Sequence, residues 1–194
     1  MDNAEAFTIE LEAYVNELAY AAERLVQLLA ARSMYLAAAE SCTGGLVADA
    51  LIRIPGASRC FWGSFVCYTS PAKEQMLGVG EDTLNKYGAV SRETAGLMAL
   101  GALRKSGADA AVSVTGIAGP GSGVTVNGLE CPAGTVWIAA VLRGKKEENL
   151  NDITDAGYVK KYNFNGSRNV VRTRAAREAI MQITELLENR LCLM

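Results

Sequence analysis

Residues 34–56 read MYLAAAESCTGGLVADALIRIPG, and this stretch decides the fold class. The apolar run from Met34 to Ala39 is short enough for a buried strand. It breaks at residues 41–45, Ser-Cys-Thr-Gly-Gly, after which apolar side chains recur at helical spacing up to Pro55. The stretch therefore predicts a strand, a tight turn and a helix, in that order.

The rest of the chain continues this alternation. Apolar residues spaced by three and four predict an amphipathic helix over residues 8–32. Further strands are expected over residues 60–68, 110–114, 134–142 and 158–164, and further helices from about residue 70, over 91–106 and over 167–191. Such alternation favours an α/β fold with a sheet covered by helices on both faces and ligands at the strand ends. The polar segment 144–157 is expected to be an exposed loop.

The length of 194 residues fits a single domain, residues 1–194, with no internal repeat or linker. Residues 1–33 are expected to form an N-terminal helix that packs on this domain or extends from it. The sequence leaves open whether that helix is packed within one chain or forms a dimer.

The composition is that of a soluble globular protein, with 50% hydrophobic residues, 21% charged residues and a net charge of −2. The basic residues do not require a nucleic-acid partner, and no stretch is long and apolar enough to span a membrane. The N-terminus lacks a basic region ahead of an apolar run, so we expect a cytoplasmic protein. Five cysteines without a CxxC pair fit a reducing compartment and make a structural zinc site improbable.

The chain contains no histidine, and this absence limits its chemistry. It excludes Ser-His-Asp and Cys-His catalytic arrangements, and common catalytic zinc sites also use imidazole. We therefore expect no metal and no cofactor. A hydrolase built from this sequence needs a general base other than histidine.

Ser41 lies in the predicted turn between a strand and a helix, where backbone N–H groups at the helix start can hold negative charge. This is a favourable position for a nucleophile. The same residues also fit a helix cap and a tight turn without a catalytic role. The neighbouring Glu40 fits either a second catalytic group or a capping or solvated carboxylate. Cys42 is expected to pack, because nothing near it favours a thiolate.

Tyr68 and Lys73 form a Tyr-x4-Lys pair at the end of a predicted strand and the start of a predicted helix. The positive end of the helix dipole and desolvation both lower the pKa of a lysine in such a place. A neutral lysine can accept a serine proton as general base. The alternative is a tyrosine that closes a strand and a lysine on a helix surface.

Two further features can bind an anion. Residues 115–123 form a glycine-rich loop after a predicted strand, with backbone N–H groups suited to a phosphate or an oxyanion. The loop matches neither a P-loop nor a dinucleotide-binding pattern, and its alternative role is a simple connection. Arg168 and Arg172 are one helical turn apart near a helix start, so both can face one phosphate or form a solvated basic face.

Taken together, these blocks resemble the CinA C-terminal family over about residues 20–190. The matching blocks are Ala39–Gly45, Phe65–Tyr68 with Ala72-Lys73, Leu77–Val79, Tyr87–Ser91, Ser113–Pro120, Gly134–Ala139 and Gly166–Arg172. The resemblance implies a three-layer α/β/α domain with a mixed sheet. It also implies hydrolysis of the carboxamide of nicotinamide mononucleotide to nicotinate mononucleotide and ammonia, with Ser41 as nucleophile and Tyr68 and Lys73 as its activating partners.

The resemblance also implies binding residues. Thr115 and Arg168 are the candidates for the nucleotide phosphate. The oxyanion is expected to bind backbone N–H groups near Cys42, Thr43, Gly44 and Gly45, or near Gly116, Ile117 and Ala118. The expected partners are a small nucleotide substrate and further copies of the chain, with neither nucleic acid nor membrane.

The sequence departs from the family pattern over residues 124–131 and 145–161, near the expected site. Substrate preference is therefore open. The alternatives are a serine amidase acting on another small carboxamide, a nucleotide-binding module without catalysis, and a protein-interaction role linked to competence or DNA damage. Turnover of an amide distinguishes the enzymes from the other two.

Overall fold

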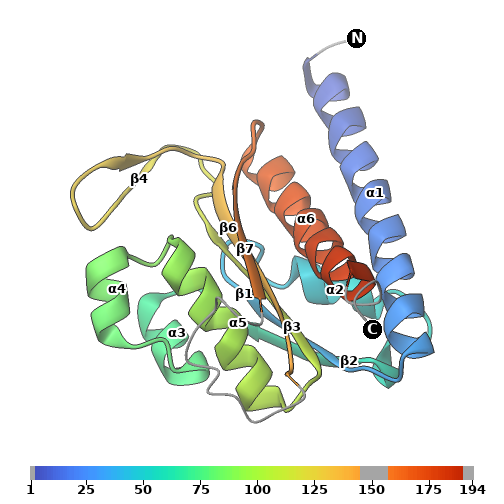
Figure 1. Cartoon of the computed structure of the whole chain (residues 1–194). Coiled ribbons are helices and arrows are strands. Elements are labelled where there is room, and N and C mark those ends of the chain that lie inside the picture. Colours follow the sequence, from blue (N-terminus) through green and yellow to red (C-terminus); the bar gives the residue numbers. More distant parts are fainter. Residues whose placement is uncertain (1–2, 145–156, 190–194) are drawn as a thin grey trace.

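Five strands form one mixed sheet, which helices cover on both faces (Figure 1). The structure is a computed structural model that describes residues 3–144 and 157–189. The strands are β1 (Leu36–Glu40), β2 (Phe61–Val66), β3 (Ala110–Gly116), β6 (Thr135–Leu142) and β7 (Gly157–Asn163), in the spatial order β2-β1-β3-β6-β7. β1 pairs in parallel with β2 and β3, whereas the β3–β6 and β6–β7 pairs are antiparallel. The predicted α/β class with a mixed sheet is confirmed.

The helices divide between the two faces of this sheet. They are α1 (Asn3–Ala31), α2 (Leu46–Ile52), α3 (Ser70–Leu77), α4 (Glu81–Tyr87), α5 (Arg92–Ser106) and α6 (Arg168–Asn189), with a short 3-10 helix η1 (Ala57–Arg59) before β2. Buried side chains of α1, α2 and α6 share one core with the sheet, and those of α3, α4 and α5 share the other. From Leu18 to Leu29, α1 packs on α6 and α2.

β1 serves both cores because its side chains alternate between the two faces. Leu36 and Ala38 belong to the core with α2 and α6, whereas Ala37 and Ala39 belong to the core with α5. All five residues of β1 are buried, as expected for a central parallel strand. The carboxyl end of β1 therefore lies inside the molecule, where the following turn can carry a shielded side chain.

Two elements lie outside the predicted pattern. The helix α4 occupies a segment for which the sequence predicted nothing. Two short strands, β4 (Gly123–Val124) and β5 (Glu130–Cys131), form a hairpin that projects from the body beside α4 (Figure 1). The predicted loop over residues 144–157 falls almost wholly outside the described residues.

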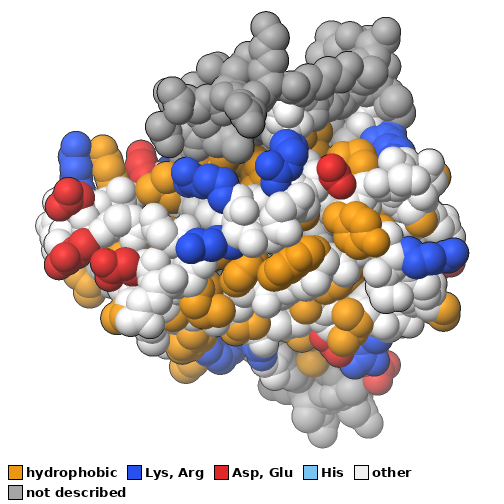
Figure 2. All heavy atoms as spheres, turned by 90° about the horizontal axis from the view of Figure 1, so that it is seen from below, with side chains coloured by type: hydrophobic (Ala, Val, Ile, Leu, Met, Phe, Trp, Pro, Cys, Tyr) orange, Lys and Arg blue, Asp and Glu red, His pale blue; other side chains and the backbone are white. Residues whose placement is uncertain are grey.

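The surface keeps some exposed apolar groups. In the view from below, hydrophobic side chains lie in the middle of the face, with lysine and arginine side chains near them (Figure 2). Trp62 and Ile52 are examples of large apolar side chains that are 48% and 64% exposed. Within residues 3–144 and 157–189, no helix has both the length and the hydrophobicity needed to cross a membrane.

Candidate active site

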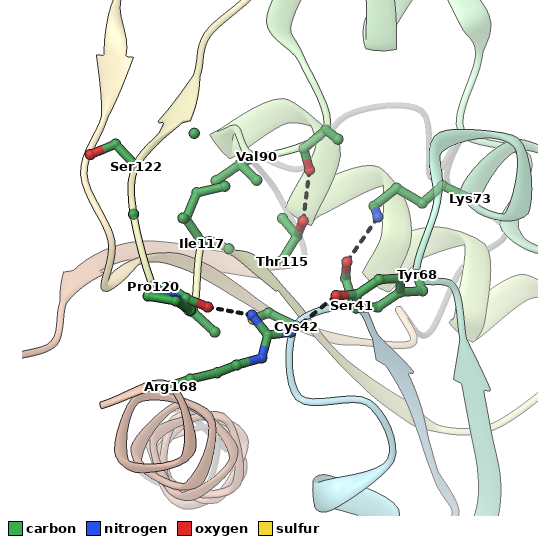
Figure 3. Close-up of a pocket in the computed structure, with 16 residues that line it drawn as sticks. Ser41, Cys42, Tyr68, Lys73, Val90, Thr115, Ile117, Pro120, Ser122 and Arg168 are labelled. Carbon is green, nitrogen blue, oxygen red and sulfur yellow. Dashed lines mark hydrogen bonds between the residues drawn. The ribbon is translucent and has the colours of Figure 1, made fainter. Parts of the chain in front are cut away.

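Ser41 follows the last residue of β1 and begins the tight turn that leads to α2. Its backbone N–H donates to the carbonyl oxygen of Val114 at 2.9 Å, which extends the pairing of β1 with β3 by one residue. Gly44 and Gly45 take left-handed conformations with φ of 60° and 98°, which residues with a Cβ rarely adopt. The Ser41 side chain lines a cavity at this end of the strand (Figure 3).

The amine of Lys73 is the partner of the Ser41 hydroxyl. Its Nζ lies 3.0 Å from the Oγ of Ser41 and 3.0 Å from the carbonyl oxygen of Cys67. The lysine is 1% exposed, and no acidic side chain in the described part of the chain forms an ion pair with it. Burial lowers the pKa of Lys73 below its ordinary value. The alternative of a lysine on the helix surface is wrong.

The local sequence fixes the helix that carries Lys73. The Oγ1 of Thr69 caps α3 by accepting the N–H of Ala72 at 3.4 Å, and Pro71 occupies the first turn. At the other end of α3, a Cβ on Gly101 of α5 would lie 2.2 Å from the carbonyl oxygen of Leu77. Glycine at position 101 thus permits α3 to pack closely on α5, and this packing buries Lys73 beside Ser41.

The cavity has a volume of about 380 Å³, within the usual range for small-molecule sites. It is lined by Ser41, Cys42, Tyr68, Lys73, Ala89, Val90, residues 115–123 and Arg168. The wall therefore comes from the ends of β1 and β3, the loop that follows β3, α3 and the residue Tyr68 before it, the segment that precedes α5, and the start of α6 (Figure 3).

A buried carboxylate holds the start of α2 beneath the turn that begins at Ser41. Glu40 is fully buried and accepts the N–H groups of Gly45, Val47 and Ala48 at 2.9 to 3.1 Å. It also accepts the hydroxyl of Ser64 at 2.9 Å. Of the roles left open by the sequence, the structure shows a carboxylate that caps the helix.

A guanidinium holds the same turn from the opposite direction. Arg172 of α6 donates its Nε to the carbonyl oxygen of Cys42 at 3.1 Å and its Nη2 to that of Thr43 at 2.8 Å. A Cβ on Gly44 would lie 3.3 Å from the same Nη2. The sequence left open whether Arg172 faces a phosphate beside Arg168 or lies on a solvated basic face, and in the structure its guanidinium is instead bonded to these two carbonyl groups.

These contacts leave two N–H groups of the turn without an oxygen acceptor. The N–H of Gly44 donates to the carbonyl of Ser41 at 3.1 Å, and that of Gly45 donates to Glu40. The N–H of Thr43 has no acceptor among the residues that the structure describes, and the N–H of Cys42 has its own thiol as its partner there. Two N–H groups next to Ser41 thus face no backbone or side-chain oxygen acceptor of the described residues.

Tyr68 and Arg168 meet at the edge of the cavity. The Nη2 of Arg168 donates to the hydroxyl oxygen of Tyr68 at 3.0 Å, and its Nη1 bonds to the carbonyl oxygen of Gly119 (Figure 3). Tyr68 is 61% exposed, and its hydroxyl makes no bond to Ser41 or Lys73 in the structure. The structure thus brings Tyr68 into the cavity, with its hydroxyl toward Arg168.

The glycine-rich loop forms the wall opposite Lys73. Thr115 is the first residue of this loop. Its hydroxyl donates to the carbonyl oxygen of Ala89 at 2.6 Å, so this proton is already used within the protein. The N–H of Ile117 donates to the carbonyl of Thr135 at 2.8 Å. The N–H of Ala118 has no such acceptor in the described ranges and stays available.

Most of the residues predicted for the site are brought together, and three take a different place. Thr43, Gly44 and Gly45 do not line the cavity; they shape the turn that carries Ser41. Cys42 is 4% exposed, and burial raises the pKa of its thiol to about 11, as expected of a packing residue. The sequence did not single out Ala89 and Val90, although both line the cavity.

Similar proteins are known. A family model described as the CinA C-terminal domain matches residues 18–187. The chain is 45% identical over 148 residues to a protein of Enterobacter agglomerans named nicotinamide-nucleotide amidohydrolase PncC. This match covers 76% of this chain and 82% of that protein. It is 41% identical over 169 residues to a CinA-like protein of Thermotoga maritima, a match that covers 87% of this chain and 37% of that relative.

The fold has solved counterparts as well. The crystal structure of a CinA superfamily protein from Klebsiella pneumoniae matches with a TM-score of 0.78 and 32% sequence identity, over 89% of this chain and 98% of that one. The chain thus spans little more than a third of the longer curated relatives, but nearly the whole of this solved structure.

Proposed function

The chain belongs to the CinA C-terminal domain family, and on this premise we propose that it is an amidohydrolase that converts nicotinamide mononucleotide into nicotinate mononucleotide and ammonia. The observation that carries the proposal is the 3.0 Å contact between the buried Nζ of Lys73 and the Oγ of Ser41. Without histidine in the chain, this pair is the nucleophile and base that the site offers. The relative named as an amidohydrolase supports the choice of reaction.

Lys73 is the proposed base because a neutral amine can take up the serine proton. A protonated lysine has three donors and no acceptor, whereas a neutral amine has a lone pair. In the structure the Nζ donates to the carbonyl oxygen of Cys67 and to the Oγ of Ser41. In the proposed reaction the neutral amine turns its lone pair toward Ser41 and accepts the hydroxyl proton. Burial without an acidic partner favours the neutral form. The serine oxygen then becomes nucleophilic as its proton leaves.

The reaction runs through an ester. The Oγ of Ser41 forms a bond to the carboxamide carbon while its proton moves to Lys73, and a tetrahedral intermediate results. Lys73 returns the proton to the amide nitrogen, the C–N bond breaks and ammonia leaves. Lys73 next takes a proton from water, which attacks the ester carbon. The C–O bond to Ser41 then breaks and Lys73 returns the proton to Ser41. The carboxylic acid product loses its own proton to solvent and leaves as a carboxylate.

The N–H groups of Cys42 and Thr43 are the proposed oxyanion donors. They lie in the turn directly after Ser41. The carbonyl of Cys42 shares a peptide group with the N–H of Thr43, and the guanidinium of Arg172 bonds to that carbonyl. A positively charged donor bonded to the carbonyl oxygen polarises the peptide group and strengthens its N–H as a donor. Such preorganised donors stabilise the charge that develops in acyl transfer.

Arg168 and the glycine-rich loop are the proposed site for the nucleotide phosphate. Arg168 lines the cavity and is positively charged, and the N–H of Ala118 is free in the same wall. For Thr115, a contact with the phosphate would require its hydroxyl to leave the carbonyl of Ala89. We therefore assign the phosphate to Arg168 first and to the loop backbone second.

Ammonia release from nicotinamide mononucleotide tests this function. The wild type and Ser41→Ala are compared without added metal, with nicotinamide and glutamine as other amides and the exposed Ser58→Ala as matched control. We expect release only from the nucleotide, unchanged in Ser58→Ala and lost in Ser41→Ala. Ammonia release that persists in Ser41→Ala would show that the proposed mechanism is wrong. Release from another amide alone favours a different carboxamide, and no release at all favours a binding module.

A further inference from the structure

The cavity beside Ser41 has a basic side chain at two places and no acidic one. Lys73 reaches toward it from α3 and Arg168 from the start of α6, from opposite directions (Figure 3). Among the described residues, no aspartate or glutamate lines the cavity. Glu40, the neighbour of Ser41, is bonded to the start of α2, and Glu74, the neighbour of Lys73, lies exposed on the surface. The lining therefore contains no charge that repels an anionic ligand.

The hydrogen bonds of Lys73 and Ser41 leave two donors without an acceptor in the protein. The Nζ of Lys73 donates to the carbonyl oxygen of Cys67 and to the Oγ of Ser41, both at 3.0 Å. The Ser41 oxygen accepts in this contact, and its own hydroxyl hydrogen has no acceptor in the described part of the chain. A protonated lysine has three N–H donors, so one also remains on the Nζ. Two neighbouring donors match the two oxygens of a carboxylate.

We infer that the cavity is a two-anion site, which holds a phosphate at Arg168 and a carboxylate at Ser41 and Lys73, and that the carboxylate binds together with a proton on Lys73. The ligand class is a phosphorylated carboxylic acid, and the product nicotinate mononucleotide belongs to it. The inference deepens the proposed function and rests on it for this choice of ligand. A carboxylate has the shape of a carboxamide, so the product fits where the substrate fits and gains the charged contacts. The product is therefore an inhibitor of its own formation.

Binding of the carboxylate depends on pH through Lys73. Burial lowers the pKa of the free amine, whereas a bound carboxylate favours its charged form and raises that pKa. Burial also raises the pKa of the two neighbouring thiols, Cys42 and Cys67, so both stay neutral; the other ionisable groups in the lining are Tyr68 and Arg168. The helix α5, which packs on α3, contributes no titratable side chain to the lining. Between the two pKa values of Lys73, binding takes up a proton, and the affinity for the product rises as pH falls.

Titration calorimetry with nicotinate mononucleotide tests the carboxylate subsite. Buffers of different ionisation enthalpy give the number of protons taken up over about pH 7 to 9, where the phosphate is ionised. We expect uptake of up to about one proton in the wild type and in the exposed control Lys86→Met. Lys73→Met should take up none and bind the product roughly tenfold to a hundredfold more weakly, because it lacks a charged donor. Circular dichroism verifies that each variant is folded.

Ser41→Ala allows the two nucleotides to be compared without turnover. Both carry the same phosphate, so the ratio of their Kd values reports the difference between carboxylate and carboxamide alone. We expect the acid to bind more tightly than the amide, with a ratio that grows by up to about tenfold for each unit by which pH falls within the titration range of Lys73. This comparison decides the inference if Lys73→Met fails to fold.

Three results would overturn the inference. Equal affinity of Ser41→Ala for the acid and the amide at every pH would show that the cavity does not recognise the carboxylate. Proton uptake that persists in folded Lys73→Met would place the proton on another group. A wild type that does not bind the product would remove the subsite. Failure of the proposed function looks different, because the wild type would then release no ammonia, while product binding with proton uptake would still support the subsite.

Discussion

The Nζ of Lys73 lies 3.0 Å from the Oγ of Ser41, in a chain that contains no histidine. Replacing Lys73 by methionine keeps a long apolar stem and removes the amine. General base catalysis contributes roughly 10²–10⁴-fold, so we expect kcat for nicotinamide mononucleotide to fall by about this factor in Lys73→Met. Steady-state ammonia release measures it, with the exposed Lys86→Met as control. A Lys73→Met protein with full kcat would remove lysine from the mechanism.

The stability of Lys73→Met shows whether a fall in kcat comes from loss of the base or from misfolding. A buried amine without an acidic partner costs free energy, and a thioether in the same place does not. We expect the free energy of unfolding of Lys73→Met at neutral pH to be equal to or higher than that of the wild type. Chemical denaturation measures it. A large loss of stability would mean that the fall in kcat reports misfolding.

The pH dependence of kcat/KM follows from the lowered pKa of Lys73. The base must be neutral, so activity rises with pH through the pKa of Lys73 in the free enzyme. We expect the rising limb to have its midpoint below the ordinary lysine value of 10.5. A midpoint at or above that value would contradict a buried neutral amine.

The same group makes stability depend on pH. Between the lowered pKa of folded Lys73 and 10.5, the unfolded chain holds a proton that the folded chain has released. The free energy of unfolding therefore gains a contribution as pH rises through this window. Lys73→Met lacks this contribution. Denaturation curves at several pH values show the difference between the two proteins.

The sequence predicts the sheet well because its central strands are nearly continuous apolar runs. β1, β3 and β6 are buried, and each follows a predicted run closely. The helix α4 has a single buried residue, Leu84, in seven, so it has no apolar period to detect. The hairpin β4–β5 did have a signal, since Asn127-Gly128 is a typical turn pair and Gly128 has a φ of 75°.

The sequence predicts which residues form the candidate site, but it predicts the contacts between them less well. Ser41, Tyr68 and Lys73 were found from short motifs, but the burial of Lys73 depends on the packing of α3 on α5, which no local pattern records. The partners of Arg172 were not predicted, because helical spacing gives its position relative to Arg168 alone. Its actual partners are the carbonyls of Cys42 and Thr43, about 130 residues earlier in the chain.

Arg172→Lys tests whether the guanidinium supports the turn that begins at Ser41. Lysine keeps the charge but lacks the planar fork that bonds two carbonyls at once. We expect kcat to fall about tenfold to a hundredfold while KM changes little, because loss of a transition-state donor or misplacement of a reacting group costs up to about this much. The control is Arg174→Lys on the same helix. In the wild type, Arg174 donates to the carbonyl oxygen of Asn165. A change in KM alone would instead point to substrate binding by Arg172.

Glu40→Gln tests the buried carboxylate under the same turn. Glutamine keeps the shape but replaces one acceptor oxygen by an NH2 group, which then faces backbone N–H donors. Buried polar groups left unsatisfied cost about 1–3 kcal/mol each, so we expect the free energy of unfolding to fall by about 2–4 kcal/mol. Urea denaturation measures it, with the exposed Glu74→Gln as control. Equal stability of the two variants would show that the carboxylate charge is dispensable.

Tyr68→Phe decides between Tyr68 and Lys73, the two activating partners that the family resemblance implies for Ser41. The hydroxyl of Tyr68 accepts from Arg168 at 3.0 Å and makes no bond to Ser41, so its removal should weaken the positioning of Arg168 and leave the proton transfer to Lys73 intact. We expect KM for nicotinamide mononucleotide to rise about twofold to tenfold, the equivalent of one hydrogen bond, with kcat nearly unchanged. Initial rates over a range of nucleotide concentrations separate the two constants. A hundredfold loss of kcat at constant KM would instead place the tyrosine hydroxyl in the proton transfer, because a residue that only orients the phosphate has no part in the chemical step.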